Sequence, residues 1–403
     1  MLNDFSMETP NSGSWSELPM DILRFLLEHL CFIDFHRAKM VCRNWYLCSK
    51  QTVRRRSGSP LLILSSEDDC VLFNPEEDRR DLSGTRFLAN SGNWFLALDS
   101  GANLYIEHVF SEKKRINLPP LESIKSDLFS LKRVGEKEFN ERAVGGFPEK
   151  GFSQRVKDLR GLLWVDKRKE EYTVAWFFDK AFCKNGEDCY RTIPTRIGVH
   201  FTSQGISDMV LRGDFLYVYT TRKYVRLLDL SGHEGFMQVT KRSFILPFHP
   251  AFPPSSEEIT YAGRLKVNYN IAVTRSGEVL LVKSMVFKAT TSDMMPKRMF
   301  HLYKTDPNPD SEDILHRENL SFEVHSLGDE ALLLDSGITV PADPTLGIEP
   351  NSIYFTRHDR VRNYVQEPSC PDICVFHLAT KKFTRFPILS YFNPKDALWF
   401  LPC

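Results

Sequence analysis

The chain has 403 residues, of which 42% are hydrophobic and 26% charged, close to the averages for globular proteins with a sizeable core. Lys and Arg number 52 and Asp and Glu number 52, so the formal net charge is zero. This balance argues against a strongly basic nucleic-acid binder or an acidic disordered chain. Length and composition predict two or three domains, or one small domain joined to a large one.

The sequence predicts a location in the nucleus or the cytoplasm. It contains no run of about 18 apolar residues, so no membrane span is expected. The amino-terminal stretch has no Lys or Arg before Arg24, which fits neither a secretory signal nor an Arg-rich transit peptide. Nine scattered cysteines, an odd number, are typical of reduced thiols.

Helical periodicity is clearest between Trp15 and Lys50, after a tail of residues 1–14 that we expect to be disordered. A first apolar stripe predicts an amphipathic helix, with Pro19 in its first turn, where a missing N–H costs no intrahelical bond. A second stripe predicts another helix, capped by Asp34. The first stripe is Ile22, Leu23, Leu26, Leu27 and Leu30, and the second is Ala38, Val41, Cys42 and Trp45.

So small a module lacks the volume to bury both stripes, so it needs a partner surface on this chain or on another protein. The series Leu18-Pro19-x-Asp21-Ile22-Leu23, then Leu30, then Val41-Cys42-Arg43-x-Trp45 resembles the F-box. The resemblance implies that residues 15–56 dock on a Skp-type adaptor, and through it on a cullin, in an SCF ubiquitin ligase. It assigns nine residues to the adaptor interface or the small core behind it: Leu18, Pro19, Ile22, Leu23, Leu26, Leu30, Val41, Cys42 and Trp45.

From Ser57 onward, short apolar runs separated by turn residues replace the helical period and predict β-hairpins. The turns Asp99-Ser-Gly101 and Arg275-Ser-Gly277 offer glycine for a positive φ. The seven expected pairs are 60–64 with 70–74, 94–98 with 103–109, 161–165 with 172–179, 215–220 with 224–230, 269–274 with 278–287, 300–305 with 321–327, and 352–356 with 372–378.

The hairpins recur roughly every 50 residues, in the range of propeller blades, although repetition alone leaves a pair of β-sandwiches open. Five stretches of the carboxy-terminal third and the end of the chain resemble the plant domain of unknown function 295, the KIB-type β-propeller, which commonly follows an F-box. These stretches are Ala272–Val282 (AVTRSGEVLLV), Phe300–Asp306 (FHLYKTD), Leu327–Leu334 (LGDEALLL), Asn351–Phe355 (NSIYF), Asp372–Phe376 (DICVF) and Ala397–Pro402 (ALWFLP).

The fold class expected is therefore α + β and multidomain: a small helical F-box at 15–56 followed by a large all-β propeller of about six to seven blades at 57–403. No phosphate loop, HExxH helix or nucleophile elbow occurs, and the cysteines and histidines lack zinc-site spacing. We therefore expect no catalytic residue, cofactor or metal. The longer loops at 136–157, 248–263 and 306–319 are candidate target-binding regions.

Two kinds of function fit this organisation. The first is a non-enzymatic adaptor that recruits an unknown target protein to an SCF ligase, with no nucleic acid or membrane as partner. The second is a propeller that binds or hydrolyses a small ligand and carries a degenerate F-box, and an organelle-resident relative is a further variant. Residues 35–56 hold seven bases and no acid, so the zero net charge conceals a locally basic segment in the module expected to meet a partner.

Overall fold

The computed structural model describes most of the chain, in segments. The described residues are 15–30, 32–52, 61–65, 70–74, 77–81, 85–111, 114–124, 129–134, 138–143, 153–155, 159–166, 171–177, 181–192, 206–220, 225–232, 237–238, 265–287, 297–305, 321–356, 373–386 and 396–401. The predicted tail at 1–14 and the loops at 248–263 and 306–319 lie outside them. The chain divides into two compact units, Met1–Gly58 and Ser59–Cys403. No helix within the described ranges is long and apolar enough to cross a membrane.

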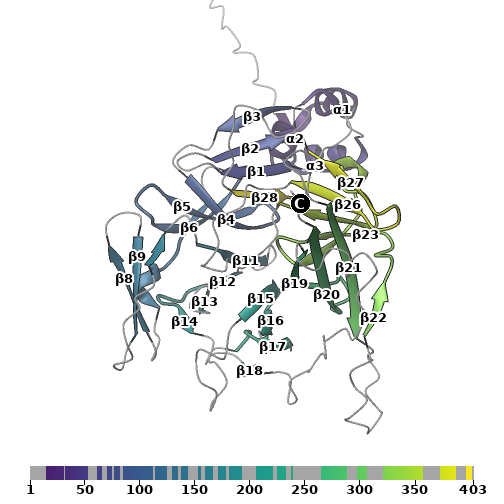
Figure 1. Ribbon diagram of the computed structural model, residues 1–403. Helices are drawn as coiled ribbons and strands as arrows, with labels where there is room; N and C mark the ends of the chain where they lie inside the picture. The colour runs from purple at the N-terminus through teal and green to yellow at the C-terminus, as the bar shows by residue number, and fades with distance from the viewer. Residues whose placement is uncertain are drawn as a thin grey trace, which may run out of the picture. The chain divides into compact units, whose positions relative to one another are not determined.

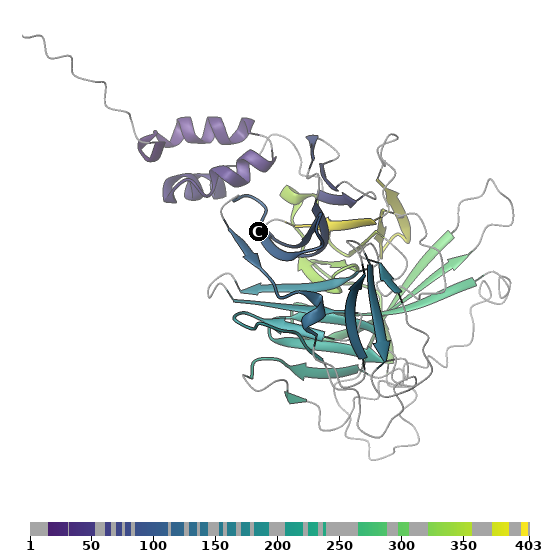
Figure 2. The same cartoon turned by 90° about the vertical axis from the view of Figure 1, so that its left-hand side faces the viewer.

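The first unit is helical. It contains the 3-10 helix η1 (Trp15–Glu17) and the α-helices α1 (Met20–His29), α2 (Phe32–Ala38) and α3 (Arg43–Gln51). Figure 2 shows these helices, in purple, packed side by side, and α3 contacts α1, α2 and η1. Leu23, Leu27 and Cys48 are fully buried between them, so the helical stripes form a small core within the module.

The second helix expected from Asp34 onward is in fact two helices, so the prediction of one continuous stripe ending at Trp45 is wrong. Asp34 is the third residue of α2, where its carboxylate pairs with Arg37 at 3.3 Å instead of capping the helix. The amide of Val41 donates to the carbonyl of Ala38, and this three-residue turn ends α2. The chain then changes direction before α3.

The second unit is a ring of mainly antiparallel sheets, the blades of a β-propeller (Figure 1). Blade 1 contains β28 (Asp396–Phe400), β1 (Leu61–Ser65), β2 (Cys70–Asn74) and β3 (Glu77–Asp81). Blade 2 contains β4 (Thr85–Ser91), β5 (Trp94–Asp99), β6 (Leu104–His108) and β7 (Arg115–Asn117). Blade 3 contains β11 (Gly161–Asp166), β12 (Glu171–Trp176), β13 (Ala181–Lys184) and β14 (Arg191–Thr192).

The remaining blades complete the ring. Blade 4 contains β15 (Ile206–Arg212), β16 (Phe215–Thr220), β17 (Val225–Asp229) and β18 (Met237–Gln238). A nine-stranded sheet combines two blades, because β19 and β24 share one parallel bridge, Val273 to Ile338. Blade 5 contains β19 (Leu265–Val273), β20 (Val279–Phe287), β21 (Lys297–Thr305) and β22 (Ser321–Val324). Blade 6 contains β24 (Ile338–Pro341), β23 (Glu330–Leu333), β25 (Ser352–Phe355), β26 (Cys374–His377) and β27 (Lys382–Arg385).

The two ends of the propeller sequence pair with each other and close the ring. The last strand, β28, lies antiparallel to β1, with Leu62 opposite Trp399. Blade 1 is thus built from the beginning and the end of the unit, and Figure 1 shows β28 beside β1. The closing strand contains the first four residues of the ALWFLP stretch, so the ring cannot be completed until nearly the whole unit is synthesised.

A three-stranded sheet stands outside the ring, between blades 2 and 3 in the chain. It contains β8 (Phe129–Val134), β9 (Glu138–Ala143) and β10 (Ser153–Arg155). Strand β11 contacts β4 directly, so blades 2 and 3 are neighbours without it. Arg133 attaches the sheet to blade 2 by donating to the carbonyls of Gly101 and Ala102 at 2.7 and 3.1 Å. The stretch predicted as a loop at 136–157 therefore includes two strands of this sheet.

All seven predicted hairpins are confirmed, from β1 with β2 to β25 with β26. Among the described residues the seven hairpins fall in six blades, because the pairs β19–β20 and β21–β22 belong to the same sheet. Gly277 has a φ of +93°, as its turn requires. In the other turn the positive φ of 57° falls on Ala102 and not on Gly101.

Alternate residues of the inner strands enter different cores, which explains their continuous apolar runs. On β19, Ile271 and Val273 pack between blades 4 and 5, whereas Ala272 packs between blades 5 and 6. On β11, Leu162 faces blade 4 and Leu163 faces blade 2. Each blade is covered on both faces by its neighbours, so both sets of side chains must be apolar.

Side-chain hydrogen bonds also link each pair of neighbouring blades. From the junction of blades 1 and 2 around to that of blades 6 and 1, they are Asn90 Nδ2 to Trp399 O (2.8 Å), Val165 N to Ser91 Oγ (3.1 Å), Lys184 Nζ to Leu230 O (2.6 Å), Ile271 N to Asp208 Oδ2 (2.9 Å), Arg275 N to Thr339 Oγ1 (2.9 Å) and Thr356 Oγ1 to Ala397 O (2.7 Å). Each of the six joins a backbone group to a side chain, and together they set the position of one blade on the next.

Candidate functional site

Helix α1 presents two different faces. Pro19 lies just before the helix, one position earlier than expected, with extended backbone and with its carbonyl accepting the Leu23 amide at 3.0 Å. Leu23 and Leu27 point into the module and are fully buried, whereas Ile22 is 49% exposed and Phe25 is 59% exposed. The helix therefore stabilises its own core with one face and leaves an apolar edge uncovered.

Trp45 on α3 is part of the module's internal structure. It is 7% exposed, and its Nε1 donates to the carbonyl of Trp15 at 2.9 Å. The two indole rings lie edge to face, with centroids 6.5 Å apart. Trp45 thus holds η1 against α3, and Trp15, at 67% exposed, remains largely at the surface.

The turn before α3 separates residues that sequence periodicity had grouped together. Cys42 has extended backbone, with φ −163° and ψ 175°, and its carbonyl accepts the first intrahelical bond of α3, from Tyr46, at 3.1 Å. Val41, one residue earlier, is 54% exposed. A residue in this turn cannot share a helical face with Trp45.

The nine residues assigned by resemblance consequently fall into three groups. Leu23 and Trp45 are buried in the core of the module. Leu18, Leu26, Leu30 and Cys42 are half-buried and pack against that core. Pro19, Ile22 and Val41 are exposed.

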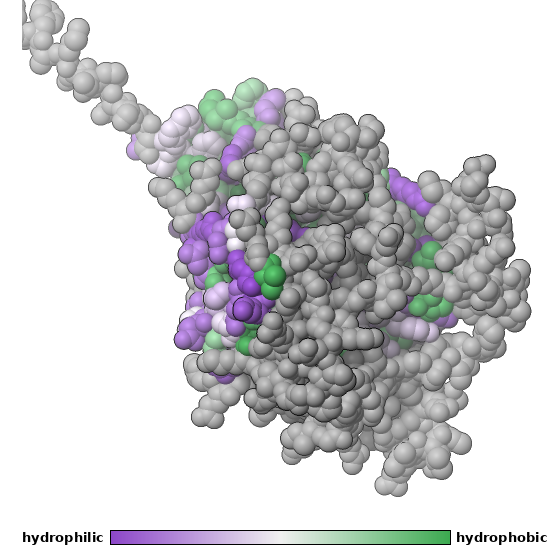
Figure 3. All heavy atoms as spheres, turned by 60° about the vertical axis from the view of Figure 1, so that its left-hand side comes forward, coloured by the Kyte–Doolittle hydropathy of each residue, from purple (hydrophilic) through white to green (hydrophobic). Residues whose placement is uncertain are grey.

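Sequence reasoning missed six exposed apolar residues of the same module. Figure 3 shows apolar side chains on the surface of the module, at the top of the view. The six residues are Trp15, Met20, Phe25, Met40, Tyr46 and Leu47, each at least 40% exposed. The composition of the core could have revealed them. Leu23, Leu27, Phe35 and Trp45 help fill the small core, so further apolar side chains of the module remain at its surface. Clustered exposed apolar residues mark an interaction surface.

Positive charge accompanies the apolar residues at α2 and α3. The ammonium groups of Lys39 and Lys50 lie 4.6 Å from the ring centroids of Phe35 and Tyr46, respectively. Such contacts hold the charges close to the aromatic side chains. Lys39 and Lys50, which belong to the basic segment predicted from the sequence, thus lie beside aromatic side chains of α2 and α3.

In the part of the chain that the structure describes, the titratable side chains form no metal centre. Within the described ranges, no three His, Cys, Asp or Glu side chains group closely enough to bind a metal ion. Cys183 and Cys189 are free thiols. Burial raises the pKa of the Cys183 thiol to about 12, so the group stays protonated near neutral pH.

A helical module with an exposed apolar surface followed by a six-bladed ring defines an F-box protein with a propeller. The F-box domain family matches residues 15–56, and the KIB1-4 beta-propeller family matches residues 62–377. The chain belongs to this family of F-box proteins, and its relatives place it in plants.

Arabidopsis thaliana relatives match over nearly the whole chain. F-box protein At5g25290 is 54% identical over 96% of both chains. F-box protein At2g14290 is 44% identical over 98% of this chain and 99% of that protein. F-box protein KIB4 is 32% identical over 100% of this chain and 99% of that protein. These matches confirm the resemblance stated from the sequence.

Proposed function

We propose that this protein is the substrate-recognition subunit of an SCF-type ubiquitin ligase. Its helical module would dock on a Skp-type adaptor, and through it on a cullin, while the propeller recruits a target protein. The observation that carries the proposal is the apolar surface containing Ile22, Phe25 and Val41, on a module whose own core is already filled. Such a surface gains free energy when it is covered, and docking on another protein would cover it.

The protein itself would catalyse no chemical step. By holding the target near the transferase bound to the cullin, it raises the effective concentration of the reacting groups. It would act in the nucleus, the cytoplasm or both, where its thiols remain reduced.

The structure changes which substitutions test this proposal. Trp45→Ala would remove a buried anchor and unfold the module, so loss of binding would say nothing about contact. Ile22→Asp combined with Val41→Asp alters only exposed side chains and should leave the fold intact. We expect this double variant to bind a purified Skp-type adaptor at least about 30-fold more weakly, because hot-spot residues contribute about 2 kcal/mol or more.

Arg24→Ala is the matched control, because Arg24 is exposed on α1 outside the apolar edge. It should bind the adaptor within about twofold of the wild type, since an exposed ion pair such as that of Arg24 with Asp21, at 3.7 Å, contributes little. Circular dichroism and thermal unfolding establish that each variant is folded. Undiminished adaptor binding by the folded double variant would refute the docking assignment.

Target recruitment is tested in cells by proximity labelling from the full chain, with the double variant as control. Proteins that are labelled by both chains, but are ubiquitinated only when the module is intact, are the expected targets. Ubiquitination that persists with the double variant would contradict the adaptor function.

A further inference from the structure

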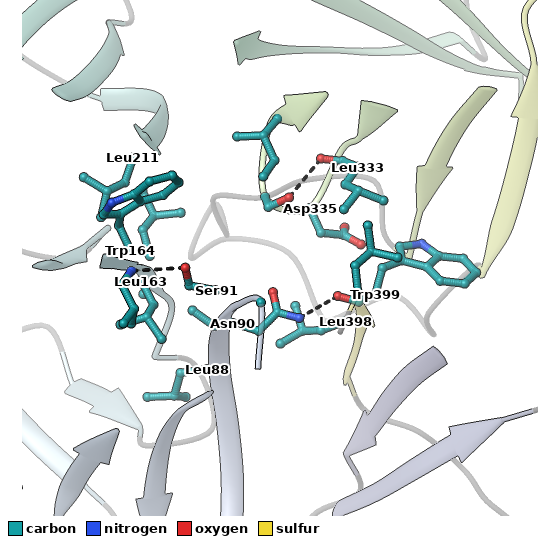
Figure 4. A pocket seen from close by; sticks show the side chains of 18 of the residues that line it. Leu88, Asn90, Ser91, Leu163, Trp164, Leu211, Leu333, Asp335, Leu398 and Trp399 are labelled. Atoms are coloured by element: carbon teal, nitrogen blue, oxygen red, sulfur yellow. Dashed lines mark hydrogen bonds between the residues drawn. The ribbon is translucent and has the colours of Figure 1, made fainter. Parts of the chain in front are cut away.

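The centre of the propeller contains a cavity of about 580 Å³. Five of the six blades line it, through strands such as β4, β11, β15, β23 and β28. Figure 4 shows Leu163, Trp164 and Leu211 on one side, Leu398 and Trp399 on the other, and Asp335 between them. Small-molecule sites have volumes of about 300–1,000 Å³, so the cavity is large enough for such a ligand. Its walls are mostly aliphatic and aromatic, which favours an apolar molecular body.

The charged groups of the wall restrict the chemistry of the occupant. Arg160 is its one basic lining residue within the described chain and is 7% exposed, while Asp166 and Asp335 also contribute to the lining. Burial lowers the pKa of the Arg160 guanidinium to about 10, and the opposite field of Asp335 only partly offsets this effect. Arg160 is still charged at neutral pH, and further negative charge near it would be stabilising.

The two carboxylates set an upper limit to that negative charge. A polyanion such as a nucleotide triphosphate would place several charges near Asp166 and Asp335 and be repelled. A molecule with one anionic group can direct it to Arg160 and keep its apolar part against Trp164, Leu211 and Leu398. The guanidinium is suited to a carboxylate or sulfonate because its donors form a planar fork.

We propose that the central cavity is a binding site for a small, mainly apolar molecule carrying a single anionic group, which Arg160 receives. This site lies wholly within the propeller and does not rest on adaptor docking. It would give the recognition domain a ligand of its own, in addition to a protein target.

Two fluorescent probes of nearly equal shape test the proposal on the full chain. Anilinonaphthalene sulfonate carries one anionic group, and phenylnaphthylamine is its neutral counterpart. We expect the folded protein to bind the sulfonate saturably, at one site and about tenfold or more tightly than the neutral probe, because of the charge-assisted contact. Inorganic triphosphate should not displace it. Equal affinity for both probes, or no saturable binding, would overturn the proposal.

Substitutions then locate the binding site. Arg160→Gln should weaken sulfonate binding about tenfold and change binding of the neutral probe less than twofold. Arg298→Gln is the matched control, because Arg298 is similarly buried, at 5% exposed, but lies against the Phe355 ring outside the cavity. Leu398→Trp should abolish binding of both probes by filling the cavity. Near-ultraviolet circular dichroism reports whether each variant retains native packing.

An Arg160→Gln variant that binds the sulfonate as the wild type does would refute the role of Arg160. If that variant does not fold, the comparison of the two probes on the wild type still decides the charge preference, and Leu398→Trp still decides the location. Undiminished binding by folded Leu398→Trp would show that the probes bind elsewhere, and would overturn the proposal.

Discussion

Gly161 shows how closely neighbouring blades approach. It begins β11, and a Cβ atom at this position would lie 2.8 Å from Leu96 Cδ2 and 3.0 Å from Trp176 Cζ3. Both neighbours are fully buried, so neither has free space to move into. Only glycine fits between blades 2 and 3 at this point without rearrangement.

We therefore expect Gly161→Ala to lower the free energy of unfolding by about 1–3 kcal/mol, the usual effect of overpacking. Urea unfolding measures the loss. Combining it with Leu96→Ala should produce less destabilisation than the sum of the two single variants, because the second substitution makes room for the methyl group. Strict additivity of the two effects would show that the contact is not the cause.

Titration of the Cys70 thiol on β2 makes the free energy of unfolding depend on pH in the alkaline range. Cys70 is 1% exposed, and burial raises its thiol pKa from 9.0 to about 11, while the Ser65 hydroxyl at 3.3 Å acts in the opposite direction. Because the unfolded thiol loses its proton first, this contribution to stability is complete below pH 9. It is lost progressively as the pH rises from 9 towards 11.

Urea midpoints measured between pH 8 and 10.5 should fall more steeply for the wild type than for Cys70→Ala. At its steepest, the difference should approach about 1.4 kcal/mol per pH unit, which corresponds to one proton. Identical pH dependence in the two proteins would contradict the assignment.

At the scale of elements, Asp208 connects two blades through its carboxylate. It is fully buried on β15 and accepts the amides of Met209 and Ile271 at 2.9 Å and the Asn270 Nδ2 group at 3.2 Å. Two of these donors belong to β19 in blade 5. A carboxylate satisfies all three donors because it has acceptor oxygens only.

Asp208→Asn should lower the free energy of unfolding by about 1–3 kcal/mol, because its amide nitrogen would face a backbone N–H. Asp229→Asn is the control: Asp229 accepts the Ser231 amide in an exposed turn of the same blade, and its loss should cost no more than about 0.5 kcal/mol. Thermal unfolding distinguishes them. Equal effects of the two substitutions would show that the link between the blades contributes nothing.

The elements also show how far local patterns predict structure. All seven hairpins follow from apolar runs and turn residues, because both signals are local in sequence. The interruption between α2 and α3 was missed, because Ala38, Val41 and Trp45 keep a helical spacing across a turn. The inner strands β4 and β15 were missed as well. Their side chains are buried by neighbouring blades, and which blades are neighbours is not a local property of the sequence.

At the scale of the whole molecule, the closing strand joins the ends of the propeller. Trp399 and Phe400 on β28 are almost fully buried, and the Phe400 ring contacts Phe95 of blade 2 at 4.8 Å between centroids. Without β28, β1 would keep β2 but lose its other partner strand, and the apolar surfaces of blades 2 and 6 would be open to water.

We expect a chain ending at Lys395 to lose cooperative unfolding and to aggregate, whereas a chain lacking only Pro402 and Cys403 should unfold like the wild type. Differential scanning calorimetry and light scattering report both properties. A truncated chain that retains one sharp transition at the wild-type temperature would show that the ring does not depend on β28.

The sequence alone determined the two parts of this protein and the kind of structure in each. Helical spacing and hairpin patterns arise from neighbouring residues, so they are readable in order along the chain. Only the tertiary structure separated Leu23 and Trp45, which form the core of the module, from Ile22 and Val41, which face outward. Spacing shows which side chains share a face of one helix, but what covers that face depends on residues far away in sequence. For the same reason, the cavity that brings Arg160 together with residues of five blades exists only in the closed ring.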